Sequence, residues 1–540
     1  MENGSDASEQ VVPNDSIDRT TGEREASTGR GPDRRSFLRG TAVGGASVFG
    51  LFTVGATSGA ASRAGYDDVV DVVEAGADDT GSESITPVLE ELRADDTAFV
   101  FPEGRYYMDR QFRYTGFENV GFFGEGATLV PADYHAFDGP QRRLFRLGVS
   151  YSPGERLAFE GFDVDQTAPD TGIRVIEAGV SDRLEVRDVT IRGVHDSGTS
   201  GPGMFALTSP DGTGVVERFR APDGGTHIDE TVNAGNGWRG PIGIEANTNV
   251  GRLEFRDCVL GGFPDNGLYA TNEDGTYVVD GGTFRNSNGA NVRVGGVGSE
   301  IRGVTVEIDE TGPHDRSQRP IRLETGEDLL VSDAEISITS PQPTSHALSV
   351  LNSCESAHIE DVDIEIEGDA VNHGIVISPE AGETEVFDTS VTHETAGGYP
   401  FWIRGSDSRD RVLAARLSID GEAGDAAGFR EGIRCERHNC RFTELEVEQP
   451  GREGVERDAL AVLGEDTTVY RATLEASRHP YVDRGADNLL RNAELESDGD
   501  NAGVHLAPDA TGSTLKVNRI HGGIRDRGAG TTHTWSNEHV

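Results

Sequence analysis

Side chains that can transfer a proton or bind a carboxylate recur at similar intervals in the middle of the chain. Glu245, Tyr269, Arg293 and Arg322 follow one another at spacings of 24, 24 and 29 residues. β-Elimination on a uronate polymer needs a group that removes the proton beside the carboxylate, and positive charge that stabilises the enolate. Tyr269 offers the acid or base, and the two arginines offer bidentate hydrogen bonds to a carboxylate. These four are therefore the candidate catalytic residues.

Further polar and aromatic residues lie near these four or at corresponding positions of the pattern. The candidate substrate-binding residues are Asn247, Asp265, Glu324, Trp238, Arg239, Trp402 and Arg404. A competing explanation for the charged members is a set of surface ion pairs. For Trp402 and Arg404 the competing explanation is local packing beside an Arg404–Glu436 ion pair rather than a sugar-stacking subsite.

A short pattern returns along the chain from Leu184 and indicates which elements carry these residues. It consists of an apolar residue, four mostly polar or small residues and a second apolar residue, as in Phe255 to Leu260. Its first members run from Phe255 to Leu515 in ten steps, with a mean spacing of 26 residues. A second segment precedes most copies and alternates apolar with polar residues, which is typical of β-strands. Two strands and turns per period, with no helical stripe, predict a right-handed parallel β-helix.

Stacked coils place equivalent residues about 4.8 Å apart, so the outward positions of one strand form a surface strip. The predicted strip contains Glu245, Tyr269, Arg293, Arg322, Ser349, Val376, Trp402, Arg434, Ala461, Val482 and His505. The pattern pauses for 69 residues between Val186 and Phe255, which predicts a loop insertion over residues 195–240 beside the polar early end of the strip. A long loop beside a rigid strip is a common place for a binding cleft.

Hydrolysis is the alternative chemistry. An inverting site needs two carboxyl groups roughly 6.5 to 9.5 Å apart. Glu245 and Glu324 lie three coils apart, roughly 14 Å at the spacing of stacked strands, which is too far. Asp265, in the turn before Tyr269, can instead pair with Glu245 across one coil.

The repeats resemble the pectate-lyase-like superfamily of right-handed parallel β-helices over residues 66 to 525. The start of the chain fits as well, because Val72 to Asp79, the helix-like Ile85 to Leu92 and Phe99 to Tyr106 resemble the entry segment of such proteins. The resemblance implies an all-β solenoid of about 12 to 14 coils whose open end is capped by a short N-terminal helix. It also allows Ca²⁺ among the carboxylates, but the acidity points to no particular site. No other cofactor and no metal site are expected.

The expected organisation has four parts. Residues 1–64 form a signal peptide with its polar leading region, residues 65–135 the cap and first coils, residues 136–525 the β-helix, and residues 526–540 a C-terminal tail.

The signal assignment rests on Arg34-Arg35-Ser36-Phe37-Leu38 and the weakly apolar Thr41 to Ala61 stretch, which resemble a twin-arginine export signal. A membrane anchor is the alternative, but a spanning helix needs about 20 strongly apolar residues, and Gly, Ser and Thr dilute this stretch. We therefore expect export by the twin-arginine machinery to the cell surface or exterior, with no stable membrane anchor after cleavage.

The net negative charge of the chain excludes one class of partner. There are 94 Asp and Glu residues against 48 Lys and Arg residues, a net charge of -46, and the one lysine is Lys516. High acidity with almost no lysine resembles proteins of extreme halophiles. A surface this acidic repels phosphate backbones, so no nucleic-acid partner is expected.

The four cysteines are too few for a disulfide scaffold. Cys258 and Cys354 fall at core positions. Cys435 and Cys440 are expected to be core thiols or a local disulfide rather than metal ligands.

These features predict an exported carbohydrate-active β-helix enzyme, with a polysaccharide as its partner and β-elimination on an acidic polysaccharide as its reaction. Two alternatives stay open: an inverting glycoside hydrolase, and a non-catalytic cell-surface protein that binds glycans through the same strip.

Overall fold

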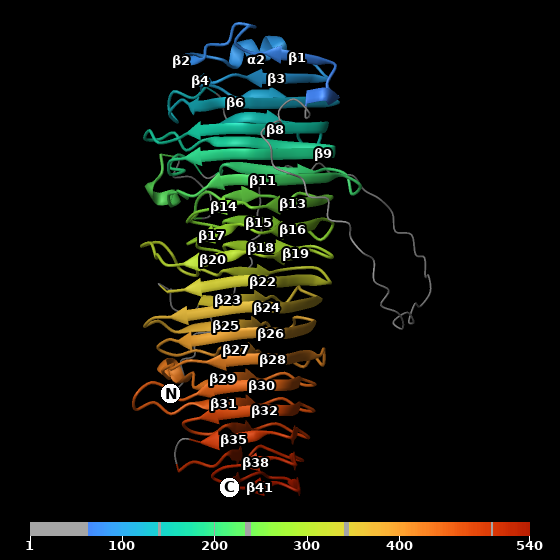
Figure 1. The fold of residues 1–540 in the computed structure, drawn as a ribbon, viewed down its shortest axis with the longest axis vertical. Helices are drawn as coiled ribbons and strands as arrows, with labels where there is room; N and C mark the ends of the chain where they lie inside the picture. The colour runs from blue at the N-terminus through green and yellow to red at the C-terminus, as the bar shows by residue number, and fades with distance from the viewer. Residues whose placement is uncertain (1–62, 139–141, 199, 233–238, 340–344, 498–499) are drawn as a thin grey trace, which may run out of the picture. The chain divides into compact units, whose positions relative to one another are not determined.

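A computed structural model of the chain describes residues 63–138, 142–198, 200–232, 239–339, 345–497 and 500–540. The expected signal peptide, apart from its last two residues, and Trp238 lie outside the described residues. The described part is a stack of parallel β-coils that runs from β1 (Asp68–Asp71) to β41 (Glu538–His539) (Figure 1). The predicted all-β parallel solenoid is confirmed. No helix in this described part has both the length and the hydropathy needed to cross a membrane.

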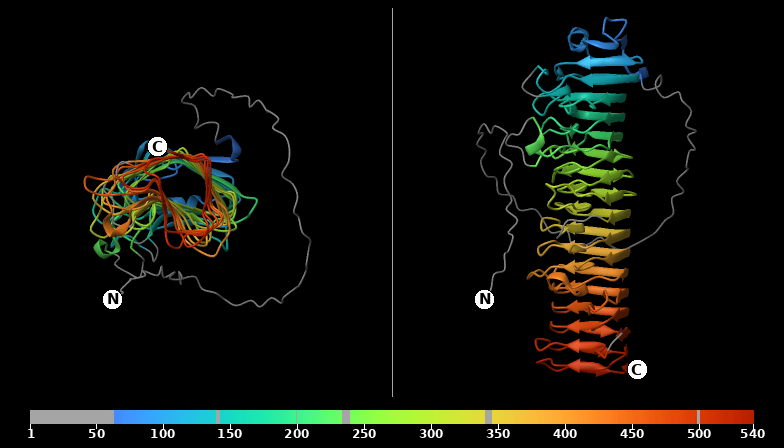
Figure 2. Two further views of the ribbon diagram at one scale, coloured as in Figure 1. Left: turned by 90° about the horizontal axis from the view of Figure 1, so that it is seen from below. Right: turned by 90° about the vertical axis from the view of Figure 1, so that its left-hand side faces the viewer.

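From β5 (Phe112–Tyr114) onward, each coil contributes strands to three rows, and along the stack the coils superpose around one core (Figure 2). Row one begins each coil. It contains β5 (Phe112–Tyr114), β7 (Arg143–Leu147), the start of β9 (Arg174–Arg192), β10 (Gly203–Leu207), β12 (Ile244–Glu245), β15 (Leu268–Thr271), β18 (Val292–Gly295), β21 (Ile321–Leu323), β23 (Ser345–Val350), β25 (Asn372–Ile377), β27 (Phe401–Ile403), β29 (Glu431–Cys435), β31 (Asp458–Val462), β33 (Tyr481–Asp483), β36 (Val504–Leu506) and β39 (Ile524–Asp526). These are 16 stacked strands in the described chain, more than the 12 to 14 coils expected, because the coils before Leu184 lack the regular pattern.

Rows two and three follow row one within each coil. In some coils one strand runs through both rows, namely β6 (Asn119–Pro131), β8 (Gly154–Asp165), β9, β11 (Thr213–Ala221), β22 (Leu329–Ile338), β24 (Ser356–Glu367), β26 (Glu383–Glu394), β28 (Val412–Asp420), β30 (Arg441–Gln449) and β32 (Thr468–Ala476). In the other coils the two rows are separate strands. Those of row two are β1, β3 (Thr97–Phe101), β13 (Arg252–Arg256), β16 (Thr276–Asp280), β19 (Glu300–Arg302), β34 (Leu489–Arg491), β37 (Thr514–Lys516) and β40 (His533–Trp535). Those of row three are β2 (Thr80–Ser84), β4 (Gly104–Met108), β14 (Val259–Leu260), β17 (Thr283–Arg285), β20 (Thr305–Ile308), β35 (Glu494–Ser497), β38 (Arg519–Ile520) and β41.

The six-residue pattern spans the bend between rows two and three. Its two apolar residues are buried on either side, and its third residue takes a positive φ that bends the strand, for example 49° at Asp257 and 51° at Asp333. Aspartate, asparagine and glycine tolerate this conformation best, which explains their frequency there. The register of β28 differs from expectation: Ala414 rather than Val412 stacks on Val386. The shift of two residues keeps the same face inward.

The core changes character along the stack. The first coils are filled by phenylalanines, and the Phe122 ring lies 5.3 Å from Phe99, 5.4 Å from Phe145 and 6.1 Å from Phe159. Later coils are filled mainly by Val, Ile and Leu. Helix α2 (Thr86–Leu92) buries Leu89 at the first end, in agreement with the expected cap.

Two segments are more regular than expected. Within residues 195–240, β10 and β11 form a coil in which Val216 stacks between Val186 and Phe255. The irregular part lies in the connection from β11 to β12, whose described residues, 222–232 and 239–243, contain η2 (Ile228–Glu230). Strands β39, β40 and β41 add a last coil over most of the expected C-terminal tail.

All four cysteines are buried free thiols, as expected for Cys258 and Cys354. Cys435 and Cys440 are core thiols in this structure rather than a local disulfide, and the Sγ atoms of both lie within hydrogen-bond reach of the Arg437 carbonyl oxygen.

Candidate functional site

The order of the predicted strip is confirmed by the strand register of row one, but Ser349, Val376, Ala461 and Val482 are each 1% exposed, so the row is not a continuous surface. Each predicted residue is the Cα partner of the next, in the order Glu245, Tyr269, Arg293, Arg322, Ser349, Val376, Trp402, Arg434, Ala461, Val482 and His505. The strip also continues in the other direction through Met204, Glu177 and Arg146. The row therefore places the candidate catalytic residues on consecutive rungs.

Arg293 is the centre of the predicted cluster. Its guanidinium makes a two-pronged ion pair with Glu324, with Nη2 donating to Oε1 at 2.6 Å, and lies over the ring of Tyr269 with Cζ 4.2 Å from the ring centroid. The Arg322 Nη2 atom is 3.8 Å from the same glutamate. The ion-pair explanation is thus correct for Arg293, Arg322 and Glu324. Two arginines share one carboxylate, so the group keeps a net positive charge beside Tyr269.

Glu245, the fourth candidate, belongs to a second ion-pair cluster on the preceding rungs. Arg174 Nη2 donates to Glu245 Oε2 at 2.9 Å, and Arg174 also lies 3.5 Å from Glu177. Glu177 binds Arg143 as well, and accepts from Arg146 at 2.9 Å. Sequence reasoning missed this cluster. The strand period did not lead to it, because the step from Glu245 back to its register partner Met204 is 41 residues, against a mean period of 26.

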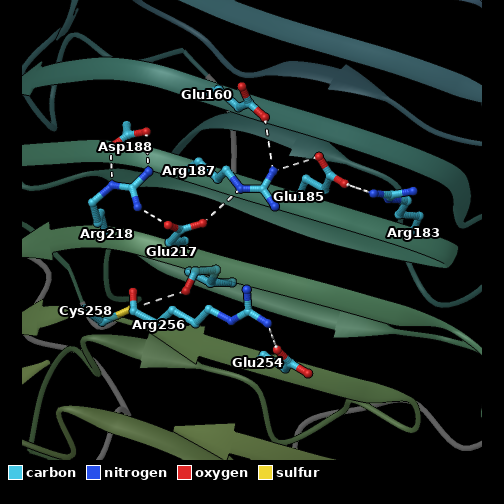
Figure 3. Close-up of polar contacts among 11 residues, drawn as sticks. Glu160, Arg183, Glu185, Arg187, Asp188, Glu217, Arg218, Glu254, Arg256 and Cys258 are labelled. Carbon is cyan, nitrogen blue, oxygen red and sulfur yellow. Dashed lines mark hydrogen bonds and ion pairs between the residues drawn. The ribbon is translucent and has the colours of Figure 1, made fainter. Parts of the chain in front are cut away.

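Burial distinguishes Arg174 and Glu177 from the ion pairs on the rest of the surface, but not Arg293 and Glu324, whose side chains are 18% and 22% exposed. Figure 3 shows a comparable network around the bend of rows two and three, where Arg187 contacts Glu160, Glu185 and Glu217. Ion pairing alone therefore does not mark a site. On row one, however, the side chain of Arg174 is 3% exposed and that of Glu177 10%, against 28% for Arg187.

Asp265 occupies the short turn between β14 and β15, and it is 8% exposed. Its Oδ1 accepts a hydrogen bond from Asn266 Nδ2 at 2.7 Å. Burial raises the pKa of Asp265 to about 7, and the nearby charge of Glu245 acts in the same direction, whereas Arg293 and Arg239 oppose it. The structure thus brings Asp265 to the candidate catalytic residues as a carboxyl group that changes its charge near neutral pH.

Arg239 lies near Asp265, and Asn247 follows Glu245 by two residues. The carbonyl oxygen of Arg239 accepts a hydrogen bond from the Ile228 amide at 2.7 Å, and burial lowers the pKa of its guanidinium, which lies near Asp265 and Asp315. The Oδ1 atom of Asn247 is buried without a hydrogen-bond partner among the described residues. This oxygen is closed off from solvent, so it is not accessible to a ligand in this structure.

Trp402 and Arg404 lie apart from this group. Trp402 is five rungs from Tyr269, about 24 Å at the strand spacing. The Arg404 guanidinium carbon is 5.1 Å from the Trp402 ring centroid. The expected Arg404–Glu436 pair is not seen in the described chain, where Glu436 instead accepts from Arg434 Nε and from the Gly405 amide at 3.0 Å. The exposed Arg404 thus lies over the indole rather than closing an ion pair. The Trp402 ring also packs against His373 and Tyr399, with centroids 5.0 Å and 5.2 Å away, which agrees with the local-packing explanation.

A groove of about 370 Å³ lies on row three, away from the predicted strip. Its polar lining residues are Thr305, Glu307, Glu335, Ser337, Asp363, Glu365, Ser390 and Thr392. Ser390 Oγ donates to Asp363 at 2.6 Å, and Arg285 pairs with Glu307. Sequence reasoning missed this groove, although its residues are the outward positions around the second apolar residue of the six-residue pattern.

A histidine and carboxylate cluster lies where no metal site was expected. His227, Asp229 and His314 offer ligand atoms that all lie within 4.8 Å of one another. They come from two different turns between rows three and one.

No protein-family model matches the chain. The search of curated proteins found no match either. Among solved structures, the chain is similar to the catalytic unit of a GH87 α-1,3-glucanase from Streptomyces thermodiastaticus, with 15% identity over 87% of this chain and 70% of that one, at a TM-score of 0.34.

It is also similar to a mutant tailspike protein of E. coli bacteriophage HK620 in complex with a pentasaccharide, with 10% identity over 81% of this chain and 80% of that one, at a TM-score of 0.45. A third similarity is to the A-module of the mannuronan C-5 epimerase AlgE6 of Azotobacter vinelandii, with 10% identity over 87% and 99% of the two chains, at a TM-score of 0.31. These similarities concern the coiled fold and assign no activity to this chain.

Proposed function

We propose that this protein is an enzyme that cleaves an acidic polysaccharide by β-elimination, at the part of row one between β12 and β21. The observation that carries the proposal is Asp265, a buried carboxyl group with a pKa of about 7 that lies near Arg293 and Arg239 and one turn from Tyr269. A proton-transfer group works best when its pKa is near the working pH. Asp265, expected at first to bind substrate, thereby becomes the proposed proton-transfer group.

The local charge supports an anionic substrate. The ion pairs of row one from β7 to β21 join five arginines, Arg143, Arg146, Arg174, Arg293 and Arg322, to three glutamates, Glu177, Glu245 and Glu324. The excess of two positive charges falls to one when Asp265 is ionised, and three of the arginines lie on coils before β12. A uronate carboxylate can compete with Glu324 for Arg293, since guanidinium binds either carboxylate with the same geometry.

The proposed reaction needs three events at the sugar ring. Ionised Asp265 removes the proton from the carbon beside the substrate carboxylate. Arg293 stabilises the negative charge that develops on that carboxylate. The electron pair forms a carbon–carbon double bond as the bond to the departing glycosidic oxygen breaks, and the hydroxyl group of Tyr269 gives that oxygen a proton. Products are an unsaturated uronate end and a new hydroxyl end.

Inverting hydrolysis is the second candidate, and the electrostatic coupling of Asp265 with Glu245 favours it. Here protonated Asp265 gives its proton to the leaving oxygen, while ionised Glu245, held by Arg174, activates a water molecule. The two reactions have opposite pH dependence. Elimination needs ionised Asp265, so its rate rises as the pH increases through about 7, whereas hydrolysis needs protonated Asp265 and slows over the same range.

The deciding experiment incubates the purified protein in high salt with pectate, alginate and glycosaminoglycans. Ultraviolet absorbance of unsaturated uronates reports elimination, and new reducing ends without absorbance report hydrolysis. Asp265→Asn should lower the rate by about 10²- to 10⁴-fold. The matched control is Asp458→Asn, which removes a buried carboxyl group of raised pKa, about 6, elsewhere on row one. Equal losses in both variants, or no reaction with any polymer, would refute the proposal; retention of one glycan without turnover would indicate a binding protein.

Trp402 and Arg404 are proposed as a distant subsite on the same strip. An indole face binds the apolar side of a sugar ring, and the exposed arginine adds a partner for a carboxylate. Longer chains would then bind more tightly than those that cannot span about 24 Å.

We also propose export by the twin-arginine machinery to the cell surface or exterior, on the strength of Arg34 and Arg35 in the sequence. Replacing both by lysine should retain the protein inside the cell. Unchanged export of this variant would refute the proposal.

A further inference from the structure

We propose that His227, Asp229 and His314 bind one divalent transition-metal ion of the zinc type. Their ligand atoms lie within 4.8 Å of one another. The two imidazole rings stack with centroids 4.1 Å apart and planes 7° apart, and since the lone pair of an imidazole nitrogen lies in the ring plane, one ring has to rotate for both to bind the same ion. Imidazole and carboxylate together suit zinc and its neighbours, whereas calcium and magnesium prefer oxygen ligands alone.

The distances fit a compact coordination site. His227 Nδ1 is 3.6 Å from Asp229 Oδ2. Two ligands of a tetrahedral zinc ion, each about 2.0 to 2.1 Å from the metal, are roughly 3.3 Å apart. The Asp229 amide donates to His227 Nδ1 at 3.3 Å, so this nitrogen carries the lone pair in the neutral ring. A metal ion between Nδ1 and Oδ2 would replace that long hydrogen bond with two shorter bonds.

Glu230 lies beside His314 but is not among the residues whose ligand atoms all lie within 4.8 Å of one another. Its Oε1 lies 3.1 Å from His314 Nε2, again close to the separation of two ligands on one ion. The side chains of Asp229 and Glu230 are 72% and 55% exposed, which leaves the metal position open to solvent for entry. A water molecule would complete four-coordination.

The site joins two long turns, and two shorter turns lie between them along the stack. His227 lies in the turn of residues 222–243, and His314 in the turn of residues 309–320, three coils further along. The two turns between them, residues 261–267 and 286–291, are short, and the first contains Asp265. The long turns therefore meet across the turn that carries the buried carboxyl group.

A metal ion would hold this arrangement together. The Ile228 amide, next to His227, donates to the carbonyl oxygen of Arg239 at 2.7 Å, and the Arg239 side chain lies near Asp265. On the other side, the Arg316 amide donates to Asn288 Oδ1 at 2.7 Å. The ion thus cross-links the segment that positions Arg239 to the neighbouring coils. This role concerns the position of Arg239 and does not require the metal to contact a substrate.

The test titrates Co²⁺ into untagged, chelator-treated full-length protein in high salt, and follows the visible absorption of the metal. One equivalent should bind with the strong absorption of four-coordinate cobalt and be displaced by Zn²⁺ but not by Ca²⁺. His227→Gln and His314→Gln should each weaken binding by at least about 100-fold, given that loss of outer partners alone costs 10- to 100-fold. His533→Gln, an exposed histidine at the last coil, should bind like the wild type.

The proposal fails if the wild type binds no stoichiometric Co²⁺ or Zn²⁺, or if His314→Gln binds as tightly as the wild type. Zn²⁺ should also raise the thermal unfolding midpoint of the wild type and leave that of His314→Gln unchanged. Binding with no effect on the wild-type midpoint would overturn the cross-linking role. No substrate enters these measurements, so their outcome is independent of the proposed polysaccharide cleavage.

Discussion

Replacement of Asp265 by asparagine should alter the pH dependence of stability in a direction set by the burial of the carboxyl group. Burial raises the pKa of Asp265 to about 7, from an ordinary value of 3.8. The unfolded chain therefore releases this proton near pH 4, whereas the folded chain keeps it until about pH 7. Because the folded chain binds more protons in this window, the free energy of unfolding falls as the pH rises through it.

The size of the effect follows from the two pKa values. One pKa unit corresponds to about 1.36 kcal/mol, so the difference between about 7 and 3.8 corresponds to about 4 kcal/mol. Proton-binding equilibria place about 3 kcal/mol of this loss between pH 5 and pH 8. Asparagine cannot ionise, so Asp265→Asn avoids the loss. The variant should gain stability relative to the wild type as the pH rises.

Thermal unfolding midpoints of the two proteins at pH 5 and pH 8, in the same high salt, measure this gain. For a folded unit from residue 63 to residue 540, unfolding entropy is about 1 kcal/mol per kelvin, so about 3 kcal/mol corresponds to about 3 °C. Asp211→Asn removes an exposed carboxyl group and controls for the change in net charge. A constant difference between wild type and Asp265→Asn at both pH values would refute the raised pKa.

Three further substitutions test other parts of the structure. Glu177→Gln leaves three arginines without their shared carboxylate and should lower the free energy of unfolding by about 3 to 5 kcal/mol. Glu494→Gln removes an exposed carboxylate and should lower it by less than about 1 kcal/mol, and thermal unfolding of the two variants measures both losses. Trp402→Ala should raise KM for long oligosaccharides and leave that for short ones unchanged, measured by initial rates. Phe122→Ala leaves a cavity at the centre of the aromatic core and should lower the free energy of unfolding by about 3 to 5 kcal/mol. Phe429→Ala, at a half-buried side chain, should lower it by less.

The coil architecture could be predicted because each coil follows from a short sequence pattern that repeats along the chain. Alternation along a strand decides which side chains face inward, and a residue with positive φ such as Asp257 or Asp333 marks each bend. Equal periods then bring Glu245, Tyr269 and Arg293 onto consecutive rungs. The same reasoning failed before Leu184, where long strands and a phenylalanine core replace the regular pattern, and the number of coils was underestimated.

The candidate site was only partly predictable. The strip order was correct, but the partners of its residues depend on side chains from other coils, such as Arg174 on Glu245 and Glu324 on Arg293. The strand period does not specify the path of a turn, so the meeting of His227 with His314 could not be foreseen.

The amino-acid sequence by itself determined the parallel coils, the inward and outward faces and the order of the residues along row one, because each depends on neighbours within one short repeat. Only the tertiary structure decided which carboxyl group is buried, which arginines share a glutamate and where two long turns meet. Burial and pairing depend on atoms that are distant in the chain and adjacent in space, and the pKa of Asp265 depends on that surrounding rather than on its sequence position.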